Sequence, residues 1–500
     1  MEVCLYNDAP ATHLERRLDG RSTIERAVAW AASLEGLVEP NEGVRVTLYS
    51  TADVPGLPGT WTVQRCGSLT EADLTHLIAT LTGTAETEIV FAFFDQPFLN
   101  AELTERMITR HRSYRAEYTF ADGYPAGLSP EIVSGHVVAH LASHASDTSL
   151  IDRRGLFPIV QKDINRLDVE TELSAIDQRL MRLHLSVDTA ANLKLCENLA
   201  PGAPSAIDEW AAHTETRREQ HRTLPRFVSI QVIEQEVQRL AYSPYPAMRE
   251  DVLAPGRVMG LSRFEDLVDQ IDAFSPEAVV HLSLWGEIAL HPDAIGLFRA
   301  VLSRPRLRLL VETSGVGWES ARADELFALD SRRFTLIVGL DSNDPERYER
   351  VRGDGFHEAQ SFARAAVDRL GDRAFVQAVR SDLTEPSLDA FYREWHELTP
   401  NVIIEKYDDF CGTLPGRKIG DISPLDRFPC WHLERDLYVL VDGRVPLCRE
   451  DLDASHPLGN VFTDGMSPVW EAGAPRFAEH VRGEWRGICE QCDEYYTFNF

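Results

Sequence analysis

Four cysteines near the end of the chain have the spacing of metal–sulfur ligands. Cys430 and Cys448 flank a short segment rich in strand-forming residues, and Cys489 and Cys492 follow as a pair separated by two residues. Such a pair can present two thiolates to one metal centre from a tight turn. Four thiolates complete the ligand shell of a [4Fe–4S] cluster or of a Zn²⁺ ion, and spacing alone does not distinguish the two. The alternative is four unrelated thiols, but a Cys-x-x-Cys motif beside two further late cysteines is seldom accidental.

The elements that must position these cysteines are short. From about residue 401 the pattern changes to brief strands and turns, and residues 437–441 and 444–447 are predicted to form a β-hairpin. The Asp442-Gly443 turn supports the hairpin because both residue types tolerate positive φ. This hairpin would place Cys448 at the end of its second strand.

Two series of alternating strands and helices precede the cysteine-rich region, separated by a polar, helix-like stretch. In the first series we expect strands at 45–49 and 88–94 and helices at 22–34, 70–81 and 101–111. In the second we expect strands at 226–232, 278–284, 308–312, 334–339 and 374–378, with helices at 263–274, 295–303, 320–329, 359–370 and 388–398. Such alternation predicts an α/β fold, with a parallel sheet or partial barrel in the second series. We therefore divide the chain into 1–205, a connector at 206–225, 226–400 and 401–500.

The charge of the chain restricts its partners. Fifty Lys and Arg residues against 79 Asp and Glu residues give a formal net charge of −29. Such a chain repels nucleic acid and anionic lipid unless it carries a basic patch, and no long Lys/Arg block is present. No apolar run approaches the ~18 residues of a membrane span, and the first residues lack the features of a signal peptide. We expect a cytosolic protein without a nucleic-acid or membrane partner; a protein or small-molecule partner stays unidentified.

The stretch from residue 429 to residue 448 resembles the opening of a SPASM domain, the auxiliary-cluster extension of many radical SAM enzymes. That opening has a cysteine, a spacer, a glycine and then a second cysteine, as Cys430, Gly443 and Cys448 do here. The full domain carries more cysteines and two clusters, so this chain resembles the shortened form with one cluster. The resemblance favours [4Fe–4S] over zinc and implies Cys430, Cys448, Cys489 and Cys492 as its ligands.

Residues 226–400 resemble a radical SAM barrel. Gly286 and Glu287 fall in a segment that looks like the loop that receives the amino group of S-adenosylmethionine. However, the cysteines of the family's Cys-x-x-x-Cys-x-x-Cys loop correspond to Glu236, Leu240 and Ser243, and leucine cannot ligate iron. We therefore expect no radical chemistry. Because a structural turn with a solvated carboxylate also explains Gly286 and Glu287, S-adenosylmethionine is not expected as a cofactor.

Residues 88–135 and 180–198 resemble cytidylyltransferases of acidic or surface-polysaccharide sugars, which have a Rossmann-like fold. The resemblance implies that Asp95 and Asp188 hold Mg²⁺ on CTP, and carboxylate oxygens are the ligands that this hard cation prefers. The family's basic phosphate loop is missing; Arg16, Arg17 or Arg21 could replace its basic groups. The alternatives are a loop carboxylate or helix N-cap for Asp95 and a capping role for Asp188.

The three resemblances together cover nearly the whole chain, in the domain order of the spiro-SPASM proteins. They imply a Rossmann-like nucleotidyltransferase domain, a partial (β/α) TIM-type barrel and a small cysteine-rich α+β SPASM domain. The first functional hypothesis is an iron–sulfur protein with one [4Fe–4S] cluster and no radical chemistry. The second is a sugar nucleotidyltransferase that uses Mg²⁺ and CTP. A third, a scaffold for a partner enzyme, has no specific support in the sequence.

Overall fold

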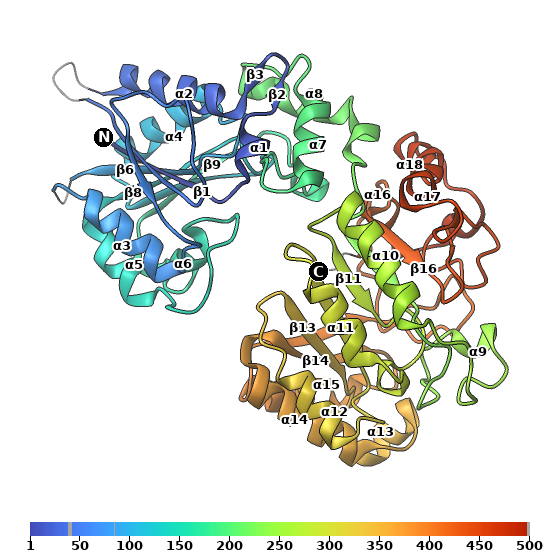
Figure 1. Ribbon diagram of the computed structural model, residues 1–500. Helices are drawn as coiled ribbons and strands as arrows, with labels where there is room; N and C mark the ends of the chain where they lie inside the picture. The colour runs from blue at the N-terminus through green and yellow to red at the C-terminus, as the bar shows by residue number, and fades with distance from the viewer. Residues whose placement is uncertain (39–42, 85, 498–500) are drawn as a thin grey trace. The chain divides into compact units, whose positions relative to one another are not determined.

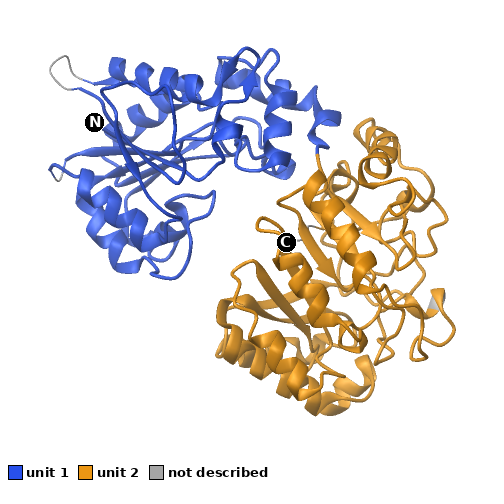
Figure 2. Cartoon of the chain, in the orientation of Figure 1, with its two compact units in different colours: residues 1–223 blue, residues 224–500 orange. Residues whose placement is uncertain are grey.

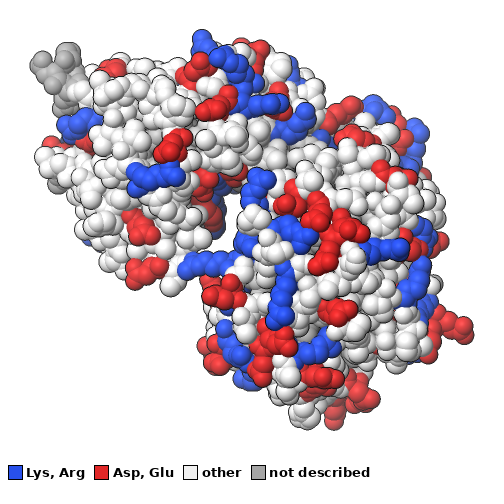
Figure 3. Space-filling model, viewed as in Figure 1, with Lys and Arg blue, Asp and Glu red and all other residues white. Residues whose placement is uncertain are grey.

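The computed structural model describes residues 1–38, 43–84 and 86–497. The chain forms two compact units, Met1–Thr223 and Leu224–Phe500 (Figure 2). Within the described residues, no helix has both the length and the apolar character that crossing a membrane requires. On the face shown in Figure 3, acidic and basic side chains are interspersed.

Unit 1 is built on a seven-stranded mixed sheet with the strand order β5-β4-β1-β6-β8-β7-β9. The fully buried β1 (Glu2–Asn7) pairs in parallel with β4 (Arg45–Ser50) and with β6 (Glu88–Phe93). The remaining strands of the sheet are β5 (Thr62–Arg65), β7 (Tyr118–Asp122), β8 (Glu131–Ser134) and β9 (Val169–Leu173). Of these, β8 runs antiparallel to both of its neighbours, β6 and β7. A separate two-stranded ribbon comprises β2 (Arg17–Leu18) and β3 (Arg21–Ser22).

Helices cover both faces of this sheet because successive side chains of its strands point to opposite sides. Along β1, Val3 and Leu5 belong to one apolar core, whereas Cys4 and Tyr6 belong to the other. In Figure 1 these cores lie under different helices. The first is covered by α2 (Thr23–Ser33), α4 (Ala101–Tyr114) and α7 (Ala190–Leu199), and the second by α3 (Glu71–Leu81), α5 (Val138–His144) and α6 (Phe157–Gln161).

The stretch expected to connect two domains is folded onto unit 1. Trp210, at the start of α8 (Trp210–Glu215), is 2% exposed, and its ring contacts that of Phe98 at a centroid distance of 5.3 Å. Nε2 of His213 lies 2.8 Å from the carbonyl oxygen of Leu199. Residues 206–223 therefore contribute to the core of unit 1.

Unit 2 contains a seven-stranded sheet in which every pair of neighbours is parallel. Its order is β15-β14-β13-β12-β11-β10-β16. The strands are β10 (Phe227–Ile230), β11 (Val279–Leu282), β12 (Arg308–Thr313), β13 (Phe334–Gly339), β14 (Ala374–Arg380), β15 (Val402–Lys406) and β16 (Asp436–Val439). Because β15 and β16 come from beyond residue 400, residues 226–400 and 401–500 share one sheet.

The predicted hairpin forms only at its turn, where the backbone N–H of Leu440 donates to the carbonyl oxygen of Arg444 at 2.9 Å, and its two strands take their main partners elsewhere. The first of its strands is β16, which pairs with β10 and so covers the edge of the large sheet. The second, β17 (Arg444–Val445), pairs instead with β18 (Gly459–Asn460). The predicted turn does form: Gly443 has a φ of 86°, and a Cβ there would lie 2.2 Å from the ring of Phe462.

One apolar core of unit 2 lies between the sheet and the helices on its convex side. Phe264, Phe298 and Phe362 are among the helix residues of that core. The principal helices of the unit are α10 (Leu261–Phe274), α11 (Ala294–Leu302), α12 (Ser320–Phe327), α13 (Pro345–Arg352), α14 (Phe356–Leu370), α15 (Glu385–His396), α16 (Trp431–Arg435), α17 (Met466–Ala472) and α18 (Ala474–Val481), with the short α9 at Tyr245–Met248.

Candidate functional site

The four predicted cysteine ligands converge on one small cavity in unit 2. Cys430 precedes α16 as its N-cap, Cys448 follows β17, and Cys489 lies in the 3₁₀ helix Gly487–Glu490, just before Cys492. All four line the same cavity. Its other lining residues are Arg427, His432, Leu433, Arg449, Glu450, His480, Ile488, Glu494 and Tyr495.

The environment of these thiols suits a bound cationic centre. Burial raises the pKa of Cys430 and of Cys448 well above the ordinary thiol range, and it raises the pKa of Cys489 to about 11. Phe428, Trp431 and Leu433 form part of the apolar surroundings. Thiolates are the metal-binding form of cysteine, so burial favours these ligands as thiolates only when iron or another cation neutralises their charge.

The cysteine sulfurs are set wider apart than a single ion requires. A tetrahedral Zn²⁺ site with bonds of about 2.3 Å places its sulfurs about 3.8 Å from one another. Over residues 1–38, 43–84 and 86–497, two groups of three ligand-type residues have their ligand atoms within 4.8 Å of one another, and neither group includes a cysteine. Binding of a single Zn²⁺ ion would therefore require three or more of these thiols to move closer together.

A fifth cysteine, missed as a site residue, lies beside this cavity. The thiol of Cys411 is a close neighbour of Cys492 and lowers the pKa of Cys492. It also lies 3.4 Å from the carbonyl oxygen of Ile488. Cys411 follows residue 410 as the other four late cysteines do, but its distance in sequence from Cys430 fits no ligand spacing that we recognised.

The concave side of the unit 2 sheet encloses a second, larger cavity of about 330 Å³. Glu405 of edge strand β15 and Tyr438 of edge strand β16 both line it, so the sheet curls around the cavity. Phe227, Leu310 and Ile337 form an apolar cluster that also borders it. This volume is within the range of small-molecule sites.

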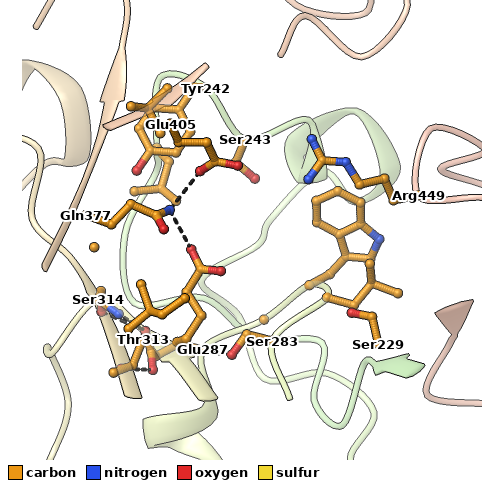
Figure 4. A pocket seen from close by; sticks show the side chains of 18 of the residues that line it. Ser229, Tyr242, Ser243, Ser283, Glu287, Thr313, Ser314, Gln377, Glu405 and Arg449 are labelled. Carbon is orange, nitrogen blue, oxygen red and sulfur yellow. Dashed lines mark hydrogen bonds between the residues drawn. The ribbon is translucent and has the colours of Figure 1, made fainter. Parts of the chain in front are cut away.

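Polar side chains from the strands also line this cavity. Nε2 of Gln377 donates to Glu405 at 2.7 Å (Figure 4). It also donates to Glu312 at 3.2 Å. Oγ of Ser229 lies 2.8 Å from Nδ1 of His281. Burial, and then repulsion from Glu312, raises the pKa of Glu405 to about 8. None of these residues stood out in the sequence, because each is a single polar position within a strand.

Glu287 is a buried structural acceptor rather than a solvated carboxylate. Its Oε1 accepts from the hydroxyl of Thr313 at 2.6 Å and from the backbone N–H of Ala289 at 3.0 Å. Its Oε2 accepts from the hydroxyl and the backbone N–H of Ser314 at 2.7 and 2.8 Å. A carboxylate has about four acceptor sites, so the chain itself saturates Glu287.

The loop that corresponds to the family's cysteine motif also borders the larger cavity. Glu236, Leu240 and Ser243 all line it. The backbone N–H of Gly286 donates to Oε1 of Glu236 at 2.9 Å. Burial and the neighbouring Glu287 raise the pKa of Glu236 to about 8. The side chains present at these three positions are a carboxyl, an alkyl and a hydroxyl group.

In unit 1, Asp95 and Asp188 do come together, but around an arginine. Arg153 pairs with Oδ2 of Asp95 at 2.8 Å through Nη1 and with Oδ2 of Asp188 at 3.2 Å through Nε. It also pairs with Asp8 at 2.6 Å through Nη2. The guanidinium thus lies where a cation shared by these carboxylates would be. The sequence did not indicate Arg153 as part of this group, because it is remote in sequence from both predicted acids.

Asp95 lies in the turn after β6, as its alternative role of loop carboxylate predicts, but the two capping roles were wrong. Asp95 is not a helix N-cap, because Asn100 caps α4, and the N-cap of α7 is Thr189 rather than Asp188. Two of the arginines that could replace the phosphate loop have partners of their own. Arg16 pairs with Glu197, and Arg17 donates to the carbonyl oxygen of Gly20.

Two solved structures show a distant likeness to the chain. BtrN in complex with AdoMet and 2-DOIA has 17% identity and a TM-score of 0.36, over 52% of this chain and 89% of that chain. Streptococcus suis SuiB bound to the precursor peptide SuiA has 12% identity and a TM-score of 0.43, over 68% of this chain and 82% of that chain.

Comparison of sequences is more specific. Residues 430–493 match the family model of the SPASM domain, an iron–sulfur cluster-binding domain. An uncharacterized protein of Treponema pallidum (strain Nichols) is 34% identical over 360 residues, which are 69% of this chain and 98% of that protein. A second uncharacterized protein of that organism is 38% identical over 66 residues, which are 13% of this chain and 30% of that protein. The chain therefore belongs to the same family as the first Treponema pallidum protein, and its C-terminal region is a SPASM iron–sulfur cluster-binding domain.

Proposed function

We propose that the protein holds one [4Fe–4S] cluster on Cys430, Cys448, Cys489 and Cys492. The observation that carries the proposal is the convergence of these four thiols on one cavity, within the segment that matches the SPASM domain. A [4Fe–4S] cluster, when bound, supplies one-electron redox chemistry or a structural cross-link. Spirochaete-type spiro-SPASM proteins are the subfamily to which the chain's domain order points.

The residues around the thiols are suited to holding such a group away from water. Nη2 of Arg427 donates to the carbonyl oxygen of Cys489 at 2.5 Å, which fixes the backbone of the Cys-x-x-Cys turn. Nδ1 of His432 lies 2.6 Å from Oδ2 of Asp436, and both side chains are buried. These contacts orient the two segments that carry Cys430 and Cys489, so the ligands are positioned before any metal binds.

We further infer that the barrel does not cleave S-adenosylmethionine by radical chemistry. Reductive cleavage requires electrons from a cluster at the first loop of the barrel, where this chain has Glu236, Leu240 and Ser243. In addition, the saturated carboxylate of Glu287 has no acceptor site left for an amino group. Both features support a barrel that positions the SPASM domain or binds a different small molecule.

Anaerobic purification with iron and sulfide analysis tests the cluster directly. We expect about four iron and four sulfide ions per chain, as one [4Fe–4S] cluster requires, together with broad visible absorption that bleaches on reduction. Stoichiometric zinc without sulfide would overturn the assignment. Incubation of the reduced protein with S-adenosylmethionine tests the second inference, because formation of 5′-deoxyadenosine would contradict a barrel without radical chemistry.

The nucleotidyltransferase hypothesis gains no comparable support. Its two predicted Mg²⁺ ligands, Asp95 and Asp188, are both paired with Arg153. The proposed function therefore rests on unit 2.

A further inference from the structure

A second group of metal-ligand side chains lies in unit 1, on and beside α5. His140 and His144 are four residues apart and so lie on one face of this helix. Asp163 comes from the turn after α6. The ligand atoms of these three residues all lie within 4.8 Å of one another. The group is far in sequence from the cysteines and does not depend on the proposed cluster.

The distances within this group are those of ligands to a single ion. Oδ2 of Asp163 lies 3.2 Å from Nε2 of His140 and 3.9 Å from Nε2 of His144. A tetrahedral Zn²⁺ ion with bonds of about 2.0–2.1 Å would set its nitrogen and oxygen ligands about 3.3 Å apart. Only small movements are therefore needed to bring the three atoms around one ion.

The hydrogen bonds of the histidines leave the required nitrogens available. Nδ1 of His144 lies 3.1 Å from the carbonyl oxygen of His140, and a proton there would direct the lone pair to Nε2. A backbone carbonyl that fixes the tautomer in this way is a common outer partner of ligating histidines. Nε2 of His140 is buried and makes no hydrogen bond, although Asp163 is near. A buried polar atom without a partner is costly, and a metal ion would satisfy it.

The positive charge nearest in sequence is already engaged. Nζ of Lys162 donates to the carboxylate of Glu71 and, at 3.0 Å, to the carbonyl oxygen of His144. This contrasts with Arg153, whose guanidinium contacts the carboxylates of Asp8, Asp95 and Asp188 directly. Lys162 instead contacts the backbone at the C-terminal end of α5, at His144.

We propose that His140, His144 and Asp163 form a mononuclear site for a first-row transition-metal dication, with Zn²⁺ as the first candidate. Imidazole and carboxylate ligands suit Zn²⁺ and its neighbours in the series. The three side chains are 31%, 35% and 42% exposed, respectively. Although Nε2 of His140 is itself buried, the group as a whole is partly exposed, and three protein ligands leave a coordination position for water or a small anion. This is the arrangement of catalytic rather than structural zinc sites.

Titration of the tag-free, cluster-loaded protein with Co²⁺ tests this site. We expect one equivalent to bind with weak d–d absorption and without sulfur-to-cobalt charge transfer, and to be displaced by Zn²⁺. The variants His140→Ala, His144→Ala and Asp163→Asn should each weaken binding at least about tenfold, the loss that follows even from removal of an outer partner of a ligand. The matched control is His136→Ala in the same segment, whose histidine pairs with Glu117 outside the group.

Three results would overturn the proposal. These are binding of equal affinity in the His140→Ala/His144→Ala double variant, no binding at millimolar Co²⁺, and a charge-transfer spectrum that assigns the metal to the cysteines. Far-UV circular dichroism shows whether the variants are folded. As an independent readout, Zn²⁺ should raise the melting temperature of the parent protein but not that of the double variant.

Discussion

The carboxylate group of unit 1 and the thiol cavity of unit 2 each gather side chains that can carry negative charge. The two regions differ in what neutralises that charge. Asp8, Asp95 and Asp188 surround the guanidinium of Arg153, which neutralises them within the chain. The four cysteines line a cavity beside Arg427 and Arg449, whose donors contact a backbone carbonyl and a carboxylate. Convergence of ligand-type residues is therefore a weak indicator of metal binding until the internal cations around them have been located.

The arginines near the thiols illustrate the difference. Arg427 and Arg449 both line the cysteine cavity, but their donors are directed elsewhere. Arg427 donates to the carbonyl oxygen of Cys489, and Arg449 donates to Asp408 at 2.5 Å. Neither thus replaces a metal in the way that Arg153 does. The comparison predicts that removal of a thiol lowers the iron content of the protein. Removal of Arg153 should instead lower the free energy of unfolding.

Removal of one thiol should have the largest effect. In Cys430→Ser we expect bound iron to fall from about four to below one per chain, because four thiolates complete the cluster's ligand shell. The matched control is Cys66→Ser, which alters a half-buried cysteine of unit 1. Iron analysis after anaerobic purification measures both. Full iron retention in Cys430→Ser would show that Cys430 is not a cluster ligand. It would also contradict the claim that the thiols of unit 2, unlike the carboxylates of unit 1, need a bound metal.

Removal of the internal cation should have the next largest effect. Arg153→Met leaves three carboxylates together and should lower the free energy of unfolding by about 3–5 kcal/mol, as breaking a buried ion pair does. The neighbouring Arg154→Met is the control, since its exposed pair with Asp152 should contribute less than ~1 kcal/mol. Urea unfolding measures both variants.

Mg²⁺ sharpens this second test. If Arg153 occupies the place of a cation, Mg²⁺ should stabilise Arg153→Met, in which the carboxylates are unpaired, but not the parent protein. Equal stabilities of the Arg153→Met and Arg154→Met variants would show that the arginine does not hold the group together.

The sequence predicted the regular elements well where the apolar pattern was periodic. The strand at 334–339 and the helices near α2 and α3 were located to within a residue or two. Both helices begin with a capping box, at Ser22 and Thr70, which is a local signal that sequence reveals. The all-parallel sheet of unit 2 likewise followed from the alternation of strands and helices.

What the sequence did not reveal depends on contacts between remote segments. The pairing of β16 with β10 joins residues about two hundred positions apart, and the local hairpin signal pointed elsewhere. Arg153 meets Asp95 and Asp188 only after folding, and no motif links them. The Cys-x-x-Cys pair, by contrast, is a local signal, which explains why the sequence pointed to the four cysteines that line the cavity but to only two of the three carboxylates around Arg153.

The pH dependence of stability should also differ at the carboxylate group. Burial, partly offset by Arg153, raises the pKa of Asp95 from 3.8 to about 7. Between pH 4 and 7 the folded state therefore binds more protons than the unfolded state, so stability falls as pH rises. Since one pKa unit corresponds to about 1.4 kcal/mol, the loss between pH 5 and pH 7 should be on the order of 2 kcal/mol.

Asp95→Asn isolates this contribution from those of other groups. The variant should lose that part of the pH dependence, because its amide does not titrate, whereas Glu131, whose pKa burial also raises to about 7, titrates in both proteins. Urea unfolding at pH 5 and pH 7 measures the difference. An identical slope in the variant would mean that Asp95 is already ionised at pH 5 beside Arg153.

The smallest effect concerns Cys492, whose neighbour Cys411 could replace it as a ligand. Because the thiol of Cys411 is a close neighbour of Cys492, we expect Cys492→Ala to retain more iron than Cys430→Ser, with Cys411 supplying the fourth ligand. Cys411→Ala alone should keep its iron, and the Cys411→Ala/Cys492→Ala double variant should lose as much as Cys430→Ser. Equal iron in the single Cys492 variant and the double variant would exclude substitution. The thiol cavity would then depend on four fixed ligands, as the carboxylate group depends on one fixed arginine.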